Sequence, residues 1–261
     1  MRTFFCETIP EPGEAAELEK SEFDHLFRTL RAAPGDAVAL FDGRGLVAVA
    51  RVEPRRTLVI AERRREPEPS KRLHLYCAVP RRAKFDVLLK QAAELGVWSI
   101  RLLRCERSVA QPEGSDRWET LLREGCKQSK NPFLPRILPM MSPAEALEEI
   151  RERKIQAFFG AVDAGKASER EEVAGGDFAW LVGPEGGFTP EEEAAFLSAG
   201  VRGLNLGPYV LRLETAAVCG LAVLRQMMAG EEKRGGRFFC CRSLFCFSSP
   251  GAATGTSAGI L

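Results

Sequence analysis

The stretch Leu181-Val182-Gly183-Pro184-Glu185-Gly186-Gly187-Phe188 stands between an apolar run and a helix-opening sequence. Residues 178–182 have the composition of a buried strand, and Thr189-Pro190-Glu191-Glu192 supplies a Thr cap, a first-turn Pro and a Glu at the third position. Glycines at a strand-to-helix turn let a ligand approach the backbone closely. The turn lacks the Lys of a P-loop and the spacing of a dinucleotide fingerprint. By itself it fits a ligand-binding loop or a plain tight turn, and the plain turn is favoured.

A second stretch of the same kind is Leu206-Gly207-Pro208-Tyr209-Val210-Leu211-Arg212-Leu213-Glu214-Thr215-Ala216-Ala217. It also follows a strand pattern and precedes a helix, and Gly207-Pro208 makes its turn. Alone, it fits a loop with a surface ion pair. Two such loops at the carboxyl ends of neighbouring strands would shape a ligand crevice, as in open α/β sheets.

Around these loops, strand and helix patterns alternate from residue 73 to about residue 230. We expect strands at 73–79, 97–103, 155–159, 178–182 and 203–206, and helices at 84–95, 118–129, from Ser142 onward, from Thr189 to Gly200 and at 214–228. This alternation indicates an α/β fold with a mostly parallel sheet covered by helices.

The two ends of the chain have other patterns. Residues 1–70 are β-rich, with a helix capped by Ser21, strands at 37–41, 46–52 and 57–62, and a linker at 63–70. These short strands predict a small β-barrel. Residues 231–261 keep no period, and we expect a disordered tail there. Cys240, Cys241 and Cys246 of this tail have no further ligands near them in the sequence, which favours incidental composition over a metal site.

Composition excludes several classes of protein. The 261 residues are 45% hydrophobic, which excludes wholesale disorder. No apolar run is long enough to span a bilayer, and no secretory signal is visible at residues 1–7. None of the eight cysteines has C-x-x-C spacing, and the chain has only two histidines, so we expect no metal and a reducing cytoplasm.

The net charge of +1 hides an uneven distribution. Residues 71–137 carry 14 Lys and Arg against seven Asp and Glu, a net charge of +7, whereas residues 138–230 carry eight against 14, a net charge of −6. The basic segment fits an ordinary solvated surface or a surface that follows RNA phosphates.

The paired loops resemble those of the 16S ribosomal RNA uridine-N3 methyltransferases, the RsmE family of the SPOUT superfamily. The resemblance extends to about residue 230 and includes His25 to Arg31, Pro34-Gly35-Asp36, Leu40 to Gly43, Glu94 to Val97, Glu106 to Val109, Gln128-Ser129, Val182 to Phe188, Leu206 to Pro208, Leu211-Arg212 and Glu214 to Ala216. Two departures are Tyr209, where the family pattern leads us to expect Arg, and Lys130-Asn131, where Gly-Arg commonly follows Gln-Ser. Both departures fall at expected RNA or interface contacts.

The resemblance implies a fold and a cofactor. It implies a deep trefoil knot in a SPOUT domain at 73–230, after a PUA-like barrel at 1–70, and a homodimer with the site at the interface. S-adenosylmethionine (SAM) would bind in the knot. The implied cofactor-binding residues are Gly183, Glu185, Gly186, Gly187, Leu206, Gly207, Leu211, Arg212 and Thr215.

The implied reaction is methylation of N3 of a decoding-region uridine in 16S rRNA of the small ribosomal subunit. We expect Arg212 to stabilise the anionic uracil, or only to hold the cofactor loop, and Glu185 to position the base or accept its proton. The expected RNA-binding residues are Arg28, Arg31, Arg81, Arg82, Lys84, Arg107 and Lys130. The alternatives are a SPOUT enzyme for another RNA position, a non-catalytic RNA-binding or ribosome-assembly factor of this fold, and, more distantly, a small-molecule anion-binding protein.

Overall fold

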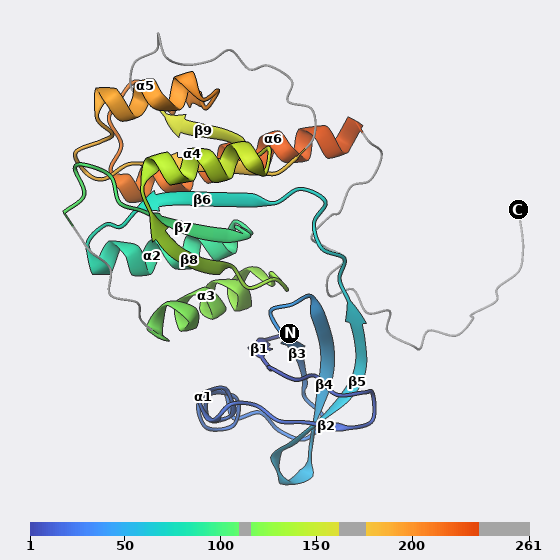
Figure 1. Cartoon of the computed structure of the whole chain (residues 1–261). Coiled ribbons are helices and arrows are strands. Elements are labelled where there is room, and N and C mark those ends of the chain that lie inside the picture. Colours follow the sequence, from blue (N-terminus) through green and yellow to red (C-terminus); the bar gives the residue numbers. More distant parts are fainter. Residues whose placement is uncertain (110–115, 162–175, 235–261) are drawn as a thin grey trace, which may run out of the picture.

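The larger part of the molecule is built on a six-stranded parallel sheet. A computed structural model describes residues 1–109, 116–161 and 176–234 (Figure 1). The strand order is β11-β9-β10-β6-β7-β8, and every neighbouring pair is parallel. The strands are β6 (Leu73–Ala78), β7 (Ser99–Leu103), β8 (Arg136–Met141), β9 (Gln156–Gly160), β10 (Phe178–Val182) and β11 (Arg202–Leu204). The predicted parallel sheet is therefore confirmed.

Helices cover this sheet because its central strands are mostly apolar and are buried along their whole length. Every residue of β6 and β10 is buried, as expected of parallel strands enclosed on both faces. The helices are α2 (Arg82–Glu94), α3 (Asp116–Ser129), α4 (Pro143–Glu152), α5 (Pro190–Ser198) and α6 (Leu213–Arg234). The predicted capping boxes are present: Ser142 caps α4 with Glu145, and Thr189 caps α5 with Glu192.

The smaller part is a five-stranded mixed sheet that lies beside α3 (Figure 1). Its order is β1-β3-β4-β5-β2, with β1 and β3 parallel and the other pairs antiparallel. The strands are β1 (Thr3–Phe5), β2 (Ala15–Ala16), β3 (Ala37–Phe41), β4 (Leu46–Glu53) and β5 (Thr57–Arg65). A short helix, α1 (Lys20–Asp24), continues into a π-helical turn, η1 (His25–Thr29), and a 3-10 turn, η2 (Pro54–Arg56), joins β4 to β5.

Four local expectations need correction. Ser21 is not the cap of α1, because the helix starts at Lys20 and its N-cap position is Glu19, which makes no side-chain capping bond. Residues 63–65 belong to β5 and not to a linker. Strand β8 was not expected at all. Helix α6 continues to Arg234, so residues 231–234 are helical, and the remainder of the expected tail, with its three cysteines, lies outside the described residues.

The small sheet has an apolar cluster of its own, and a second cluster runs across the contact between the two sheets. Phe5, Phe41 and Val47 of the small sheet belong to the same buried cluster as the core of the large sheet. Backbone hydrogen bonds from Gly45 and Leu134 add a polar link between the parts, since they join the turn after β3 to residues 132–134 before β8. Within the described ranges, no helix combines the length and apolar character needed to cross a bilayer.

Candidate functional site

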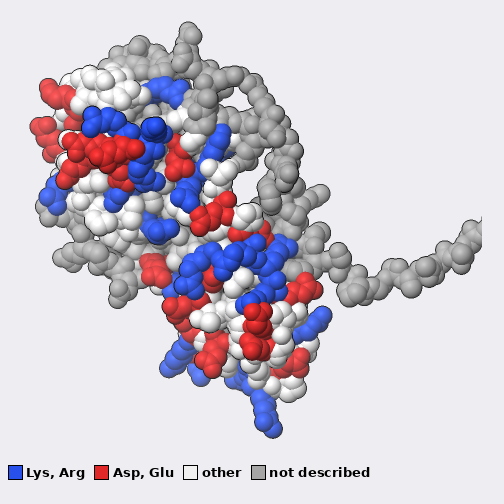
Figure 2. Space-filling model, turned by 45° about the vertical axis from the view of Figure 1, so that its right-hand side comes forward, with Lys and Arg blue, Asp and Glu red and all other residues white. Residues whose placement is uncertain are grey.

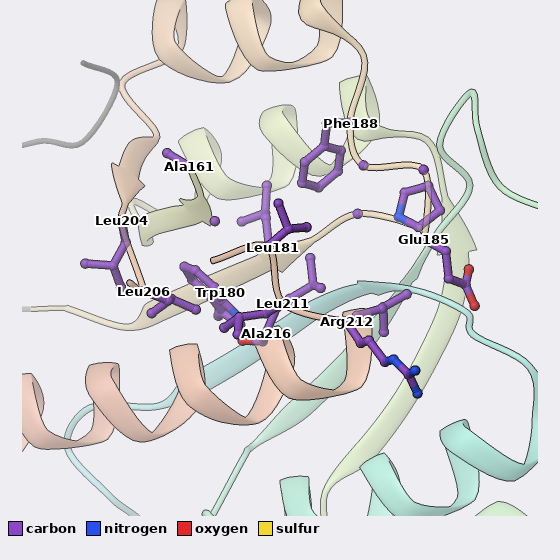
Figure 3. Close-up of a pocket in the computed structure, with 18 of the residues that line it drawn as sticks. Ala161, Trp180, Leu181, Glu185, Phe188, Leu204, Leu206, Leu211, Arg212 and Ala216 are labelled. Atoms are coloured by element: carbon purple, nitrogen blue, oxygen red, sulfur yellow. The ribbon is translucent and has the colours of Figure 1, made fainter. Parts of the chain in front are cut away.

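A pocket of about 620 Å³ opens at the edge of the large sheet where its strands end. The carboxyl ends of β9, β10 and β11 contribute Ala161, Gly183 and Leu204, and the first turn of α6 closes one side. Parallel strands end at a common edge, so loops far apart in sequence meet there. The two glycine-containing loops singled out from the sequence both line this pocket (Figure 3).

The first loop is a tight turn held from inside. The Gly187 amide donates to the Pro184 carbonyl at 2.8 Å, and Gly187 has φ of +72°, a conformation that favours glycine. Phe188 then turns into the core, where its ring meets that of Phe196 edge-on at 4.8 Å. The three glycines of the loop therefore leave its backbone open to the pocket.

Residues after β7 brace this turn from outside. The Arg107 Nη1 atom donates to the carbonyl of Gly186 at 2.9 Å and to that of Phe188 at 3.3 Å. The Glu106 amide donates to Glu192, the capping-box residue of α5, at 3.0 Å. Arg107, expected to contact RNA, thus holds the glycine turn in place.

The second loop is preset by a side-chain turn. The Gly207 amide donates to the Asn205 Oδ1 atom at 2.8 Å, and Gly207 has φ of +136°. Leu213 is buried and anchors the start of α6. Trp180 of β10 donates from its indole nitrogen to the Ala216 carbonyl at 3.1 Å, which ties the floor of the pocket to this helix.

The pocket has an apolar end and a charged end. Ala161, Leu204, Leu206 and Trp180 gather at one end, while the side chains of Glu185 and Arg212 lie together at the other (Figure 3). Such an arrangement suits a ligand with an apolar or aromatic portion and a polar or charged reacting portion.

A salt bridge stabilises the charged end. The Lys84 ammonium of α2 lies 3.2 Å from the Glu214 carboxylate of α6. The pKa of Glu214 is lowered mainly because its carboxylate accepts a hydrogen bond from its own backbone amide, with further contributions from Lys84 and from the positive charge of Arg212. Glu214 is therefore an anion at neutral pH, and it pairs with Lys84 near the mouth of the pocket.

Most of the expected cofactor-binding residues come together here. The lining includes Gly183, Glu185, Gly186, Gly187, Leu206, Gly207, Leu211 and Arg212, whereas Thr215 is exposed and outside it. Sequence reasoning missed Ala161, Trp180 and Leu204. Trp180 lies in β10, and Ala161 and Leu204 lie at the ends of β9 and β11. These positions indicate pocket-lining residues only when the strand order of the sheet is known, and the sequence alone does not supply that order.

The expected RNA-binding residues are more dispersed. Lys84 lines the pocket, and Arg81 and Arg107 follow β6 and β7 at the same edge. Arg28 and Arg31 belong to the small-sheet part, where Arg28 pairs with Asp24 at 3.0 Å. Lys130 follows α3 with a φ of +60°, and Arg82 is the first residue of α2, with a side chain outside the described set.

The basic segment 71–137 is partly neutralised by its neighbours. Its ion pairs with residues outside the segment include Arg72–Glu68, Arg101–Glu149, Arg123–Glu19 and Lys127–Glu22. On the face shown in Figure 2, Lys and Arg alternate with Asp and Glu over the large part and gather into a band across the top of the small part. The individual cations near the pocket are therefore better candidates for RNA contacts than the net charge of the whole segment indicates.

The remaining titratable groups have structural roles. His74 is buried, with Nδ1 at 2.7 Å from the Ser99 hydroxyl and Nε2 at 3.1 Å from Asp177, which confirms the expected structural histidine. Burial raises the pKa of the Cys105 and Cys126 thiols to about 12. Among the described residues, no cluster of three His, Cys, Asp or Glu side chains could hold a metal ion.

Comparison with known proteins gives a consistent set of relatives. Residues 66–225 match the family model of the RNA methyltransferase domain. The chain is 29% identical over 235 residues to the ribosomal RNA small subunit methyltransferase E of Mycobacterium bovis, covering 85% of this chain and 90% of that one. It is 28% identical over 233 residues to the protein of the same name from Aquifex aeolicus, covering 86% and 99%.

Solved structures give the same result. The ribosomal RNA small subunit methyltransferase E from Neisseria gonorrhoeae, bound to S-adenosyl methionine, has a TM-score of 0.77 and 25% identity, with coverage of 87% of this chain and 98% of that one. A probable rRNA-methyltransferase from Porphyromonas gingivalis, at 23% identity and a TM-score of 0.74, has the same fold. The likeness extends over both sheets.

Proposed function

The chain belongs to the RsmE family of RNA methyltransferases, and from this premise we propose that it transfers a methyl group from SAM to N3 of a uridine in 16S rRNA. The observation that carries the proposal is the pocket at the sheet edge, which is formed by the two loops that the resemblance assigns to SAM. The relatives named for methylation of small-subunit rRNA cover 85% and 86% of this chain.

The residues present fit SAM. A volume of about 620 Å³ is within the range of cofactor pockets. The apolar end, with Trp180, Leu204 and Leu206, suits the adenine, and the backbone of the two glycine-containing loops supplies polar groups for its edge. The charged end, with Glu185 and Arg212, is then left for the amino-acid portion and for the substrate base.

The chain's own residues have a limited chemical task. SAM supplies an electrophilic methyl group when it is bound, so the protein has to place uracil N3 in line with that group and ease loss of the N3 proton. We propose that Arg212 stabilises the negative charge that uracil gains when N3 loses its proton. Glu185, exposed at the same end of the pocket, is proposed to orient the base or to accept the proton.

The finer features of the fold are also proposals. We propose a trefoil knot within residues 73–230, supported by two loops that meet over one pocket at the edge of a parallel sheet. We propose that residues 1–70 form a PUA-like RNA-binding domain, supported by the mixed five-stranded sheet and by Arg28 in η1 and Arg31 just after it. A homodimer is proposed from the resemblance, and the half-buried Val218 and Cys219 of α6 are consistent with it.

The partner proposed for this chain is the small ribosomal subunit or its 16S rRNA, in the cytoplasm where that RNA is assembled. We propose that Arg81 and Lys84 near the pocket supply cations for RNA phosphates, whereas Arg107 holds the glycine turn. Because N3 lies on the Watson–Crick edge, the target base must leave its stack before it can react.

The decisive test is methyl transfer to a defined nucleotide. Small-subunit particles that lack the modification would be incubated with the protein and labelled SAM, and the 16S rRNA analysed by mass spectrometry after nuclease digestion. We expect one N3-methyluridine in the decoding region. Label at another nucleotide would indicate another RNA position, and SAM binding by calorimetry without transfer would contradict the enzyme.

A further inference from the structure

One exposed aromatic side chain stands at the mouth of the pocket. Three aromatic residues line it, and of these Trp180 and Phe188 are buried whereas Tyr209 is 81% exposed. The next residue, Val210, also lines the pocket and is 78% exposed. Large apolar side chains exposed beside a binding pocket mark a surface that meets another molecule.

The backbone fixes Tyr209 in this exposed position. The Asn205 side chain accepts the Gly207 amide, Gly207 adopts a φ of +136°, and the ring of Pro208 restricts the next torsion. After Tyr209 the chain turns inward, and Leu213 is buried at the start of α6. The loop thus presents an aromatic ring to the outside from a preset support, which lowers the entropy lost when a partner binds.

The surroundings favour a nucleobase as the partner of this ring. Arg212 and the Lys84–Glu214 pair lie at the same pocket, so an aromatic face stands among groups suited to a polar, anionic substrate. A base that leaves its stack loses contacts on both faces, and proteins commonly replace them with an aromatic ring. We propose that Tyr209 stacks on the target uracil and so holds the flipped base at the pocket, a role that rests on the methyl transfer proposed above.

The test compares ring-retaining and ring-removing variants. Tyr209→Phe keeps the aromatic face, Tyr209→Leu keeps apolar bulk without it, and Tyr209→Ala removes both. With small-subunit particles and labelled SAM, we expect kcat/KM for the particle to fall about tenfold or more in the Leu and Ala variants, the usual strength of base–aromatic stacking. The Phe variant should stay within about twofold of wild type. The dissociation constant for SAM, measured by calorimetry, should be unchanged in all three.

Val87→Ala is the matched control, because Val87 is 53% exposed on α2 and outside the pocket lining. It should behave as wild type. Full activity of Tyr209→Leu would overturn the stacking role, as would a Phe variant as impaired as Ala. A loss of dimer mass by light scattering in Tyr209→Ala would instead assign the residue to an interface between copies of the chain. If wild type transfers no methyl group to rRNA, the proposed function fails and this role fails with it.

Discussion

At the scale of single residues, the proposed chemistry depends most on Arg212. Its guanidinium is a planar cation with several N–H donors, so it can stabilise an anionic uracil without a proton-transfer step of its own. The positive charge of Arg212 is also one of the smaller causes that lower the pKa of the Glu214 carboxylate. The charged end of the pocket, where Arg212 lies, is therefore already polar before any substrate arrives, which limits the reorganisation needed in the reaction.

We expect Arg212→Ala to lower kcat for methyl transfer about 100-fold or more, as when a group that stabilises a developing anion is removed. The dissociation constant for SAM should change by less than about threefold. Arg212→Lys should recover part of kcat because it restores the charge but not the planar fork. Single-turnover transfer and calorimetry measure the two effects separately. A loss of SAM affinity that accounts for the whole loss of activity would reduce Arg212 to a residue that holds the cofactor loop.

Arg107 illustrates a residue whose role changed once its contacts were known. We expect Arg107→Ala to weaken SAM binding about tenfold, because charge-assisted hydrogen bonds to the carbonyls of Gly186 and Phe188 are lost and the glycine turn is released. Arg104→Ala is the control, since Arg104 is also exposed after β7 but makes no described contact with the turn. The prediction fails if Arg107→Ala binds SAM normally and loses only affinity for the particle.

At the scale of elements, helix α6 approaches β10 so closely that only glycine fits between them. A Cβ atom on Gly220 would lie 2.0 Å from the Cε2 atom of Trp180, the residue that forms the pocket floor. In an open helix, Gly→Ala would stabilise by about 1 kcal/mol. Here overpacking against a fully buried indole should outweigh that gain.

We therefore expect Gly220→Ala to lower the free energy of unfolding by at least about 1 kcal/mol in urea titrations. SAM affinity should fall as well, because Trp180 cannot keep both its place and its hydrogen bond to Ala216. Ala222→Ser, an exposed change on the same helix, should stay within about 0.5 kcal/mol of wild type. Equal or greater stability of Gly220→Ala would show that α6 can shift away from the strand at little cost.

The burial of His74 near the start of β6 predicts that the stability of the protein depends on pH. His74 is buried between Ser99 and Asp177, with Arg153 and Glu149 of α4 nearby, and its pKa is lowered mainly by burial. The unfolded chain, whose His pKa is about 6.5, therefore takes up a proton at a higher pH than the native protein. Its contribution to stability is present above that pKa and is lost as pH falls below it.

We expect the free energy of unfolding to decrease as pH is lowered from 7.5 to 5.5, and His74→Asn to flatten this part of the curve. Urea titrations at several pH values measure both curves. His25→Asn is the control, because its ring lies in the small-sheet part near Phe4 and outside this network. An equally steep curve in His74→Asn would assign the dependence to other groups.

The elements with strong local signals were predicted well. Residues 178–182 form β10, and both capping boxes sit at the predicted residues, because capping and apolar runs are local properties. Strand β8 was missed because its sequence has no alternation and contains Pro139, which is tolerated only on an edge strand. Ser21 failed as a cap because the turn before η1 is too irregular for a capping pattern to identify its start.

The candidate site was predictable only as far as its loops were. Glycine-rich turns after strands indicated two halves of a crevice, and the structure brings them to one pocket. The bracing by Arg107 could not be foreseen, because its acceptors lie about 80 residues away in the sequence and only the strand order brings them together. Thr215 was placed by resemblance alone, and the first turn of α6 directs it outward, away from the pocket.

At the scale of the whole molecule, the two sheets are joined by an apolar contact edged with ion pairs. The Arg123 guanidinium lies 3.8 Å from the centre of the Phe5 ring and pairs with Glu19 at 2.9 Å. Lys127, also on α3, pairs with Glu22 of α1 at 2.6 Å. Glu22 is only 8% exposed, and its second carboxylate oxygen has no hydrogen-bond partner among the described residues. Lys127 is thus the main compensation for a buried negative charge where the parts meet.

Removing that compensation should loosen the small-sheet part from the large one. We expect Lys127→Met to lower the free energy of unfolding by about 3–5 kcal/mol, because Glu22 is left as an uncompensated buried charge. The double variant Glu22→Leu with Lys127→Met should recover most of the loss, since replacing both partners by apolar side chains is often neutral. Lys90→Met is the control, because the side chains of Lys90 and Glu124 are 42% and 45% exposed and surface pairs contribute about 1 kcal/mol or less.

Lys127→Met should affect SAM binding and rRNA methylation differently, because the two parts of the molecule have different proposed roles. All residues that line the proposed SAM pocket belong to the large-sheet part, so SAM affinity of Lys127→Met should equal that of wild type at temperatures where the variant is folded. If residues 1–70 position the rRNA, kcat/KM for small-subunit particles should fall in Lys127→Met and return in the double variant. Calorimetry with SAM and transfer assays with particles measure these effects side by side. If Lys127→Met unfolds no earlier than Lys90→Met, Lys127 does not compensate the buried charge of Glu22. If Lys127→Met is less stable but methylates particles as wild type does, the rRNA is positioned without this contact.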